Sequence, residues 1–71
     1  MSDSQVEHGI RELLKARRIS GLQWFEVESR HGVATIRACV NSEFSHRTCY
    51  ECCRHMPGVR YVVDRIEVMH A

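Results

Sequence analysis

The sequence predicts an α+β fold in which two helices pack on one face of a three-stranded mixed sheet. Apolar residues recur at helical spacing near the N-terminus and again in the second half of the chain. Between these segments the apolar period changes to two, which is typical of strands. A Pro-Gly pair then precedes a last alternating segment. The predicted order is αββαβ, in a single domain over residues 1–71.

The first helix is predicted from its start, its end and the stripe between them. Ser4 and Glu7 are three residues apart and fit a capping box. The helix should end near Arg17 or Arg18, because a Ser-Gly pair follows. Its apolar stripe, which we expect to face the sheet, is Val6, Ile10, Leu13 and Leu14.

Residues 22–40 are predicted to form a β-hairpin. The turn is expected at Arg30-His31-Gly32, where glycine tolerates positive φ. Apolar residues alternate on both arms and would face the helices: Phe25, Val27, Ala34, Ile36, Ala38 and Val40.

A second helix and a last strand follow. Ser42 is the expected N-cap, and Pro57 stops the helix because it lacks an amide proton. Gly58 then leads into the last strand, and a helical crossover makes that strand parallel to one arm of the hairpin. The stripe of the second helix is Ser45, Cys49, Cys52, Cys53 and Met56.

Composition excludes some classes of function. A formal net charge of +1 over 71 residues argues against nucleic-acid binding by bulk charge. No apolar run approaches the ~20 residues that span a bilayer, so no transmembrane segment is expected. The N-terminal residues lack the pattern of a signal peptide, which predicts a cytoplasmic protein, or a periplasmic one if a leader has been removed.

The order of elements and two motifs resemble the BON domain, a small bacterial module of osmotic-shock, secretin-associated and membrane-stress proteins. The motifs are Gly-Val-x-Thr-Ile at residues 32–36 and Gly-Val-x-x-Val-x-Asp-x-Ile-x-Val at residues 58–68. The resemblance covers nearly the whole chain. It implies a non-catalytic binding module, and it raises the prospect of phospholipid binding, which is often proposed for these domains.

The cysteines allow two interpretations. A zinc or redox site would use Cys49, Cys52 and Cys53, with His46 and His55 nearby. The alternative is core packing, because buried cysteine behaves as a small hydrophobic residue and the resemblance places small residues on this face. We prefer core packing, and we expect no metal and no cofactor. A further thiol, Cys39, faces the other side of the hairpin and is expected to be exposed.

Catalysis has no support in the sequence. No nucleophile elbow, phosphate loop or recognisable carboxylate pair is present, so we expect no catalytic residue and no enzyme. So small a domain should leave little room for a ligand pocket of ~300 Å³ or more. The five histidines are expected to be solvated surface residues.

Two surfaces are candidates for binding. A basic stripe on the first helix, Arg11, Lys15 and Arg18, would suit peripheral binding to anionic phospholipid. The sheet face away from the helices would instead carry a contiguous apolar group that suits a protein partner or self-association. The residues of that group are Trp24, Val33, Tyr61, Val63 and Met69. Charged residues are interleaved with this group: Glu26, Glu28, Arg37, Arg65 and Glu67.

Overall fold

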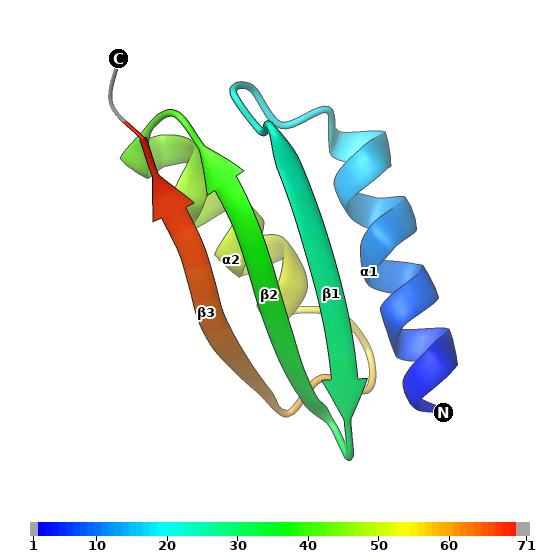
Figure 1. Cartoon of the computed structure of the whole chain (residues 1–71). Helices are drawn as coiled ribbons and strands as arrows, with labels where there is room; N and C mark the ends of the chain where they lie inside the picture. The colour runs from blue at the N-terminus through cyan, green and yellow to red at the C-terminus, as the bar shows by residue number, and fades with distance from the viewer. Residues whose placement is uncertain (1, 70–71) are drawn as a thin grey trace.

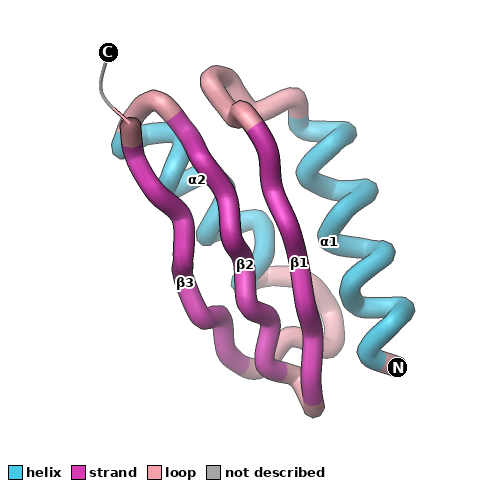
Figure 2. The backbone as a smooth tube through the Cα atoms, in the orientation of Figure 1, coloured by secondary structure: helices cyan, strands magenta, loops and turns pink. Residues whose placement is uncertain are grey.

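The fold is the predicted α+β arrangement of two helices and a three-stranded mixed sheet (Figure 1). This computed structural model describes residues 2–69. The strand order is β1-β2-β3, with β1 antiparallel to β2 and β2 parallel to β3. Both helices lie on one side of the sheet, α1 along β1 and α2 behind the other two strands (Figure 2). The elements are α1 (Asp3–Arg17), β1 (Trp24–Arg30), β2 (Val33–Val40), α2 (Glu43–Arg54) and β3 (Tyr61–Val68).

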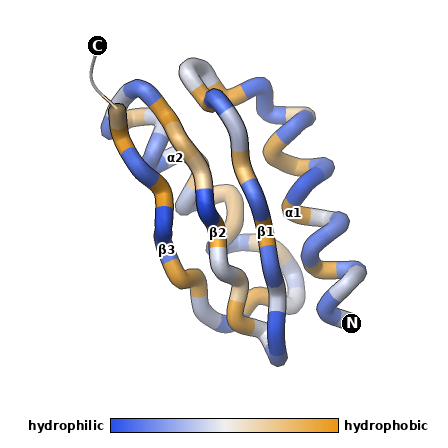
Figure 3. The backbone as a smooth tube through the Cα atoms, viewed as in Figure 1, coloured by the Kyte–Doolittle hydropathy of each residue, from blue (hydrophilic) through white to orange (hydrophobic). Residues whose placement is uncertain are grey.

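One core lies between the helices and the sheet. In the second half of β3, charged and apolar residues alternate from Arg65 to Val68 (Figure 3), because successive strand residues point to opposite faces. Every element contributes to the core, and most of the predicted stripe of each helix is buried. The buried residues of the core are Val6, Ile10, Leu14, Val27, Ala34, Ile36, Val40, Cys49, Cys53 and Val62. Leu13, Cys52 and Met56, which were also assigned to the stripes, are only half-buried.

The start of α1 differs from the prediction. The N-cap is Ser2, whose hydroxyl oxygen accepts from the Gln5 amide at 3.2 Å while the Gln5 side chain accepts from the Ser2 amide at 2.9 Å. The Ser4–Glu7 capping box is therefore wrong, and the helix begins two residues before Gln5, at Asp3. The predicted end is confirmed: the helix stops at Arg17.

Polar side chains of α1 bind the free edge of β1. The Asp3 carboxylate accepts from the His31 amide at 3.0 Å, and the Glu7 carboxylate accepts from the Ser29 amide at 2.7 Å. One turn further on, the Arg11 guanidinium donates to the Val27 carbonyl at 3.3 Å. Four helical residues rise about 6 Å and two strand residues about 6.8 Å, so the two repeats stay in step. We call these three side chains, Asp3, Glu7 and Arg11, the edge ladder.

The hairpin turn is where the sequence places it. His31 and Gly32 have φ values of 50° and 83°, the positive pair that suits a tight two-residue turn between twisted strands. A Cβ on Gly32 would also lie 2.7 Å from Arg60 Cδ, so the position favours glycine for two reasons.

Gly9 lets the two helices approach closely. A Cβ at this position would lie only 2.7 Å from the terminal methyl carbon of Met56. Glycine within a helix costs about 1 kcal/mol relative to alanine. Here that cost accompanies a notch in α1 that accepts the Met56 methyl, just beyond the end of α2.

Candidate functional site

The cysteines of α2 mostly fill the core, as the preferred interpretation predicts. Cys49 and Cys53 are fully buried. Loss of solvation on burial is the main reason that the pKa of Cys49 is raised to about 11 and that of Cys53 to about 12. Both thiols therefore stay protonated at neutral pH, which does not suit a reactive thiolate. Within residues 2–69, no three His, Cys, Asp or Glu side chains converge as a metal site would require.

The expectation of an exposed Cys39 is wrong. This residue does lie on the face away from the helices, but only 6% of it is exposed. It occupies the central strand, with Trp24 on one side and Glu67 on the other in the same row. Large neighbours on both edge strands therefore cover the small thiol.

His46 is not the solvated residue that was expected. One ring nitrogen lies 2.6 Å from the Asp64 carboxylate on β3, and the other lies 3.3 Å from the Glu43 carboxylate on α2. The hydrogen bond to Asp64 is the largest cause of a raised His46 pKa, with a smaller contribution from Glu43, and partial burial opposes them. The imidazole thus links α2 to the last strand, and both carboxylates favour its charged form.

The predicted basic stripe of α1 is interrupted in the fold. Arg11 belongs to the edge ladder and also lies 3.6 Å from Glu7, and Lys15 pairs with Glu12 at 3.7 Å. Arg18 follows the helix, in a left-handed conformation with φ of 49°. The three residues therefore do not form one free cationic row.

The open sheet face is the side of the sheet that the helices leave uncovered. Paired residues of neighbouring strands lie side by side on one face, so the register defines four rows across the sheet. These rows are Trp24–Cys39–Glu67, Glu26–Arg37–Arg65, Glu28–Thr35–Val63 and Arg30–Val33–Tyr61.

The rows divide the predicted apolar group in two. Trp24 lies at one end of the face, together with Met69, whose amide bonds to the Val40 carbonyl just beyond the first row. Tyr61 and its neighbours Val33 and Val63 occupy the other end. A charged row separates the ends, so the expectation of a contiguous patch is wrong. The exposed large hydrophobic residues of this face are Trp24, Val33, Tyr61 and Met69.

The charges of the open sheet face are balanced. It carries the carboxylates of Glu26, Glu28 and Glu67. It carries equally many guanidinium groups. The arginines are Arg30, Arg37 and Arg65, and one ion pair, Glu28–Arg30 at 2.8 Å, lies within β1.

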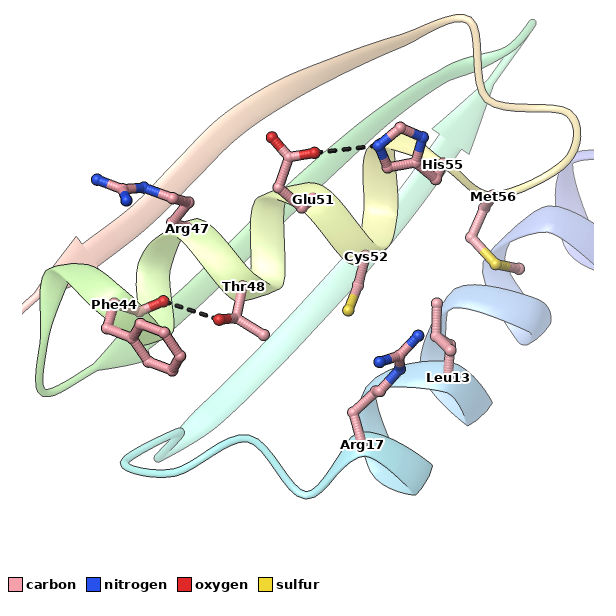
Figure 4. Close-up of a pocket in the computed structure, with 9 residues that line it drawn as sticks. All are labelled: Leu13, Arg17, Phe44, Arg47, Thr48, Glu51, Cys52, His55 and Met56. Carbon is pink, nitrogen blue, oxygen red and sulfur yellow. Dashed lines mark hydrogen bonds and ion pairs between the residues drawn. The ribbon is translucent and has the colours of Figure 1, made fainter.

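A second surface, which we call the inter-helix groove, was not foreseen from the sequence. It has a volume of about 500 Å³, so the prediction that so small a domain leaves little room for a pocket of this size is wrong. Its α1 wall is Leu13 and Arg17, and these side chains point toward α2 (Figure 4). Its α2 wall is a row of residues four apart in sequence, the last of them just beyond the end of the helix: Phe44, Thr48, Cys52 and Met56. The first three each precede a buried residue of the α2 stripe by one position.

The α2 wall presents mainly apolar atoms. The Thr48 hydroxyl donates to the Phe44 carbonyl at 2.9 Å, which leaves its methyl group for the groove. Phe44 is 76% exposed, the highest value among the exposed large hydrophobic residues of the described chain. The sequence did hold a signal: Phe44 lies beside the buried stripe rather than on it, so the core does not require an aromatic residue there.

Charges around the groove are unevenly paired. Glu51 on its outer rim contacts both Arg54 at 3.3 Å and His55 at 3.1 Å. By contrast, no carboxylate of residues 2–69 lies within ion-pair distance of Arg17 or Arg47. Figure 4 shows Arg17 directed into the gap between the helices and Arg47 directed away from it.

Comparison with known proteins adds no assignment. No family model matches the chain, and no curated protein matches it significantly. In the described part of the chain, neither helix is long and apolar enough to cross a bilayer.

Proposed function

We propose that this domain is a non-catalytic, BON-like binding module that docks a protein through the open sheet face, and that its partner is a second copy of the chain. One observation carries the proposal: the face is uncovered by residues 2–69, holds equal numbers of opposite charges and has large apolar residues at both ends. Tyr and Trp are among the residue types that most often anchor protein interfaces. Here Trp24 lies at one end of the face and Tyr61 at the other.

A two-fold axis parallel to β2 gives complementary contacts. Such an axis places β1 of one copy over β3 of the other and keeps the rows aligned. Glu26 then faces Arg65 of the second copy, and the symmetry repeats this pair. In the last row Arg30 faces Tyr61 of the second copy, a favourable cation–π arrangement. At the centre Arg37 faces Arg37 of the second copy, and within each copy Glu26 lies beside Arg37 in the same row.

The area predicts a weak complex. Eight residues along β2 span about 26 Å and three strands about 14 Å, so the footprint is roughly 370 Å². Stable interfaces bury about 800 Å² on each partner. We therefore expect a dimer that forms reversibly in the range of tens to hundreds of micromolar.

Sedimentation velocity across a concentration series tests the proposal. The wild-type chain should shift from monomer to dimer as concentration rises, and Glu26→Arg should oppose this by placing like charges together. The double variant Glu26→Arg, Arg65→Glu restores the opposite charges in exchanged positions and should regain dimerisation. Glu12→Arg, on the outer side of α1, makes the same charge change elsewhere and should leave dimerisation intact.

Two results would overturn the proposal. One is a wild-type chain that stays monomeric up to about 1 mM, well above the range expected from so small an interface. The other is dimerisation that Glu26→Arg and Val63→Glu both leave unchanged, since each puts a charge against the opposing copy.

Lipid binding through the first helix is the weaker proposal. Arg11 and Lys15 already pair with carboxylates of α1, and Arg18 lies outside the helix. Anionic vesicles would compete with these internal pairs for the same cations. The test is flotation with vesicles of acidic phospholipid at low salt. Binding would support the weaker proposal only if reversing the charges of Arg11 and Lys15 abolished that binding.

A further inference from the structure

We propose that the inter-helix groove is a binding site for a small amphipathic organic anion, an aromatic or short aliphatic body that carries one acid group. The apolar body would lie between Phe44 and Leu13, and the acid group would bind the Arg17 guanidinium. This site lies on the helical side of the domain and is independent of the open sheet face.

The groove supplies a long apolar surface. From Phe44 to Met56 the α2 wall is about 18 Å long, given the rise of a helix. Within this wall the Thr48 hydroxyl donates to the backbone carbonyl of Phe44, and Cys52 is half-buried. At one end of the groove the Met56 methyl packs against Gly9 of α1. An apolar ligand body would cover Phe44, which is otherwise largely in solvent.

Charge selects an acid over a neutral or basic ligand. Arg17 is the α1 side chain directed into the gap in Figure 4, and no carboxylate of residues 2–69 pairs with it. Glu51, the carboxylate at the rim, is held by Arg54 and His55 on the outer side of α2. A planar guanidinium suits a carboxylate or sulfonate, which it can bind through two hydrogen bonds.

Size favours a small molecule. The groove volume of about 500 Å³ falls within the range of small-ligand sites, which are mostly apolar with a few placed polar groups. The walls and the single inward cation match this pattern.

A pair of fluorescent probes tests the proposal on the full chain. Anilinonaphthalene sulfonate has an aromatic body and one acid group, and phenylnaphthylamine has the same kind of body without the charge. Wild type should bind the sulfonate with one site per chain and the neutral probe roughly tenfold more weakly, because a hydrogen bond to a charged partner is lost.

Matched variants locate the site. Arg17→Gln should weaken sulfonate binding by roughly tenfold and leave the neutral probe unchanged, whereas Lys15→Gln, the same charge loss on the same helix, should change neither. Phe44→Ala should weaken both probes, and Phe44 is exposed enough that folding should survive. Circular dichroism melts of each variant check that binding reports the native state.

Cys52 offers a second readout. It is half-buried in the groove, whereas Cys39, Cys49 and Cys53 are buried. The bound sulfonate should slow alkylation of Cys52 by iodoacetamide several-fold in wild type and not in Arg17→Gln. Sulfonate binding that is equally strong in Arg17→Gln, or that leaves Cys52 alkylation unchanged, would overturn the proposal. So would the absence of saturable binding.

Discussion

The two edges of the sheet are protected in different ways. Along β1 the edge ladder of α1 binds backbone groups at three successive points, and one of them, the Ser29 amide, is buried. Along β3 the Asp64 side chain accepts from the Ile66 amide at 3.0 Å. The amides of Tyr61 and Met69 bond toward β2, so by alternation the Ile66 amide points to the free edge.

This difference shows how a helix can serve two surfaces. One face of α1 is apolar and packs into the core, and the adjacent face is polar and replaces the strand that β1 lacks. An unpaired edge invites pairing with other chains unless it is covered or blocked. On β1 the side chains of α1 bind the edge from Val27 to the turn at His31. On β3 a carboxylate blocks one position and is itself bound by His46.

The largest loss of stability is expected when the central contact of the edge ladder is removed. Glu7→Ala leaves the buried Ser29 amide without its acceptor, so the free energy of unfolding should fall by about 2 kcal/mol. Glu12→Ala removes only an exposed ion pair with Lys15 and should cost at most about 0.5 kcal/mol. Urea denaturation of both variants gives the comparison. Equal losses would show that the ladder does not stabilise the β1 edge.

A smaller effect, which depends on pH, is expected on the β3 side. Because the folded-state pKa of His46 is raised above 6.5, its charged form stabilises the fold below that pH. This contribution is lost as the pH rises through the raised pKa. The free energy of unfolding should therefore fall by at most about 1 kcal/mol across this interval, the upper end for a partly exposed ion pair.

Asp64→Asn separates the two roles of this carboxylate. The amide oxygen can still accept from Ile66, but the negative charge beside His46 is gone. Urea denaturation at a series of pH values should show that most of the fall disappears in the variant. If the free energy of unfolding fell with pH equally steeply in wild type and variant, the ion pair between His46 and Asp64 would be excluded as the source of the fall.

The smallest effect is expected at the outer end of the edge ladder. Asp3→Ala removes the exposed acceptor of the His31 amide and a negative charge at the start of α1, and should cost about 0.5 kcal/mol. Ser4→Ala, in the same turn, should cost nothing measurable, since the cap is Ser2. If Ser4→Ala proved the more damaging change, the helix start described for α1 would be incorrect.

The fold could be predicted because its periods are clear. Helical and strand spacing placed every element to within a few residues, and the glycine turn fixed the hairpin. The cap was misplaced because Ser2–Gln5 and Ser4–Glu7 both fit the local pattern. What separates them is the contact between Glu7 and Ser29, 22 residues apart in sequence, which local spacing does not reveal.

The candidate surfaces were harder to predict because they depend on neighbours. Alternation assigns Trp24 and Tyr61 to the same face, but only the register with both neighbouring strands reveals the charged row between them. Cys39 was assigned to the correct face, yet its burial depends on the side chains at both edges. The groove required the distance between two helices, which neither helix encodes alone.

The contact between Gly9 and Met56 has a consequence for oxidative damage. Met56 is half-buried, and the methyl end of its thioether packs against Gly9 of α1. Conversion to the sulfoxide would add a polar oxygen on the sulfur next to that methyl group, and Gly9 has no side chain that could donate a hydrogen bond to it. Peroxide exposure should therefore separate the helices at this end before it affects the sealed thiols, and methionine sulfoxide reductase should reverse the change.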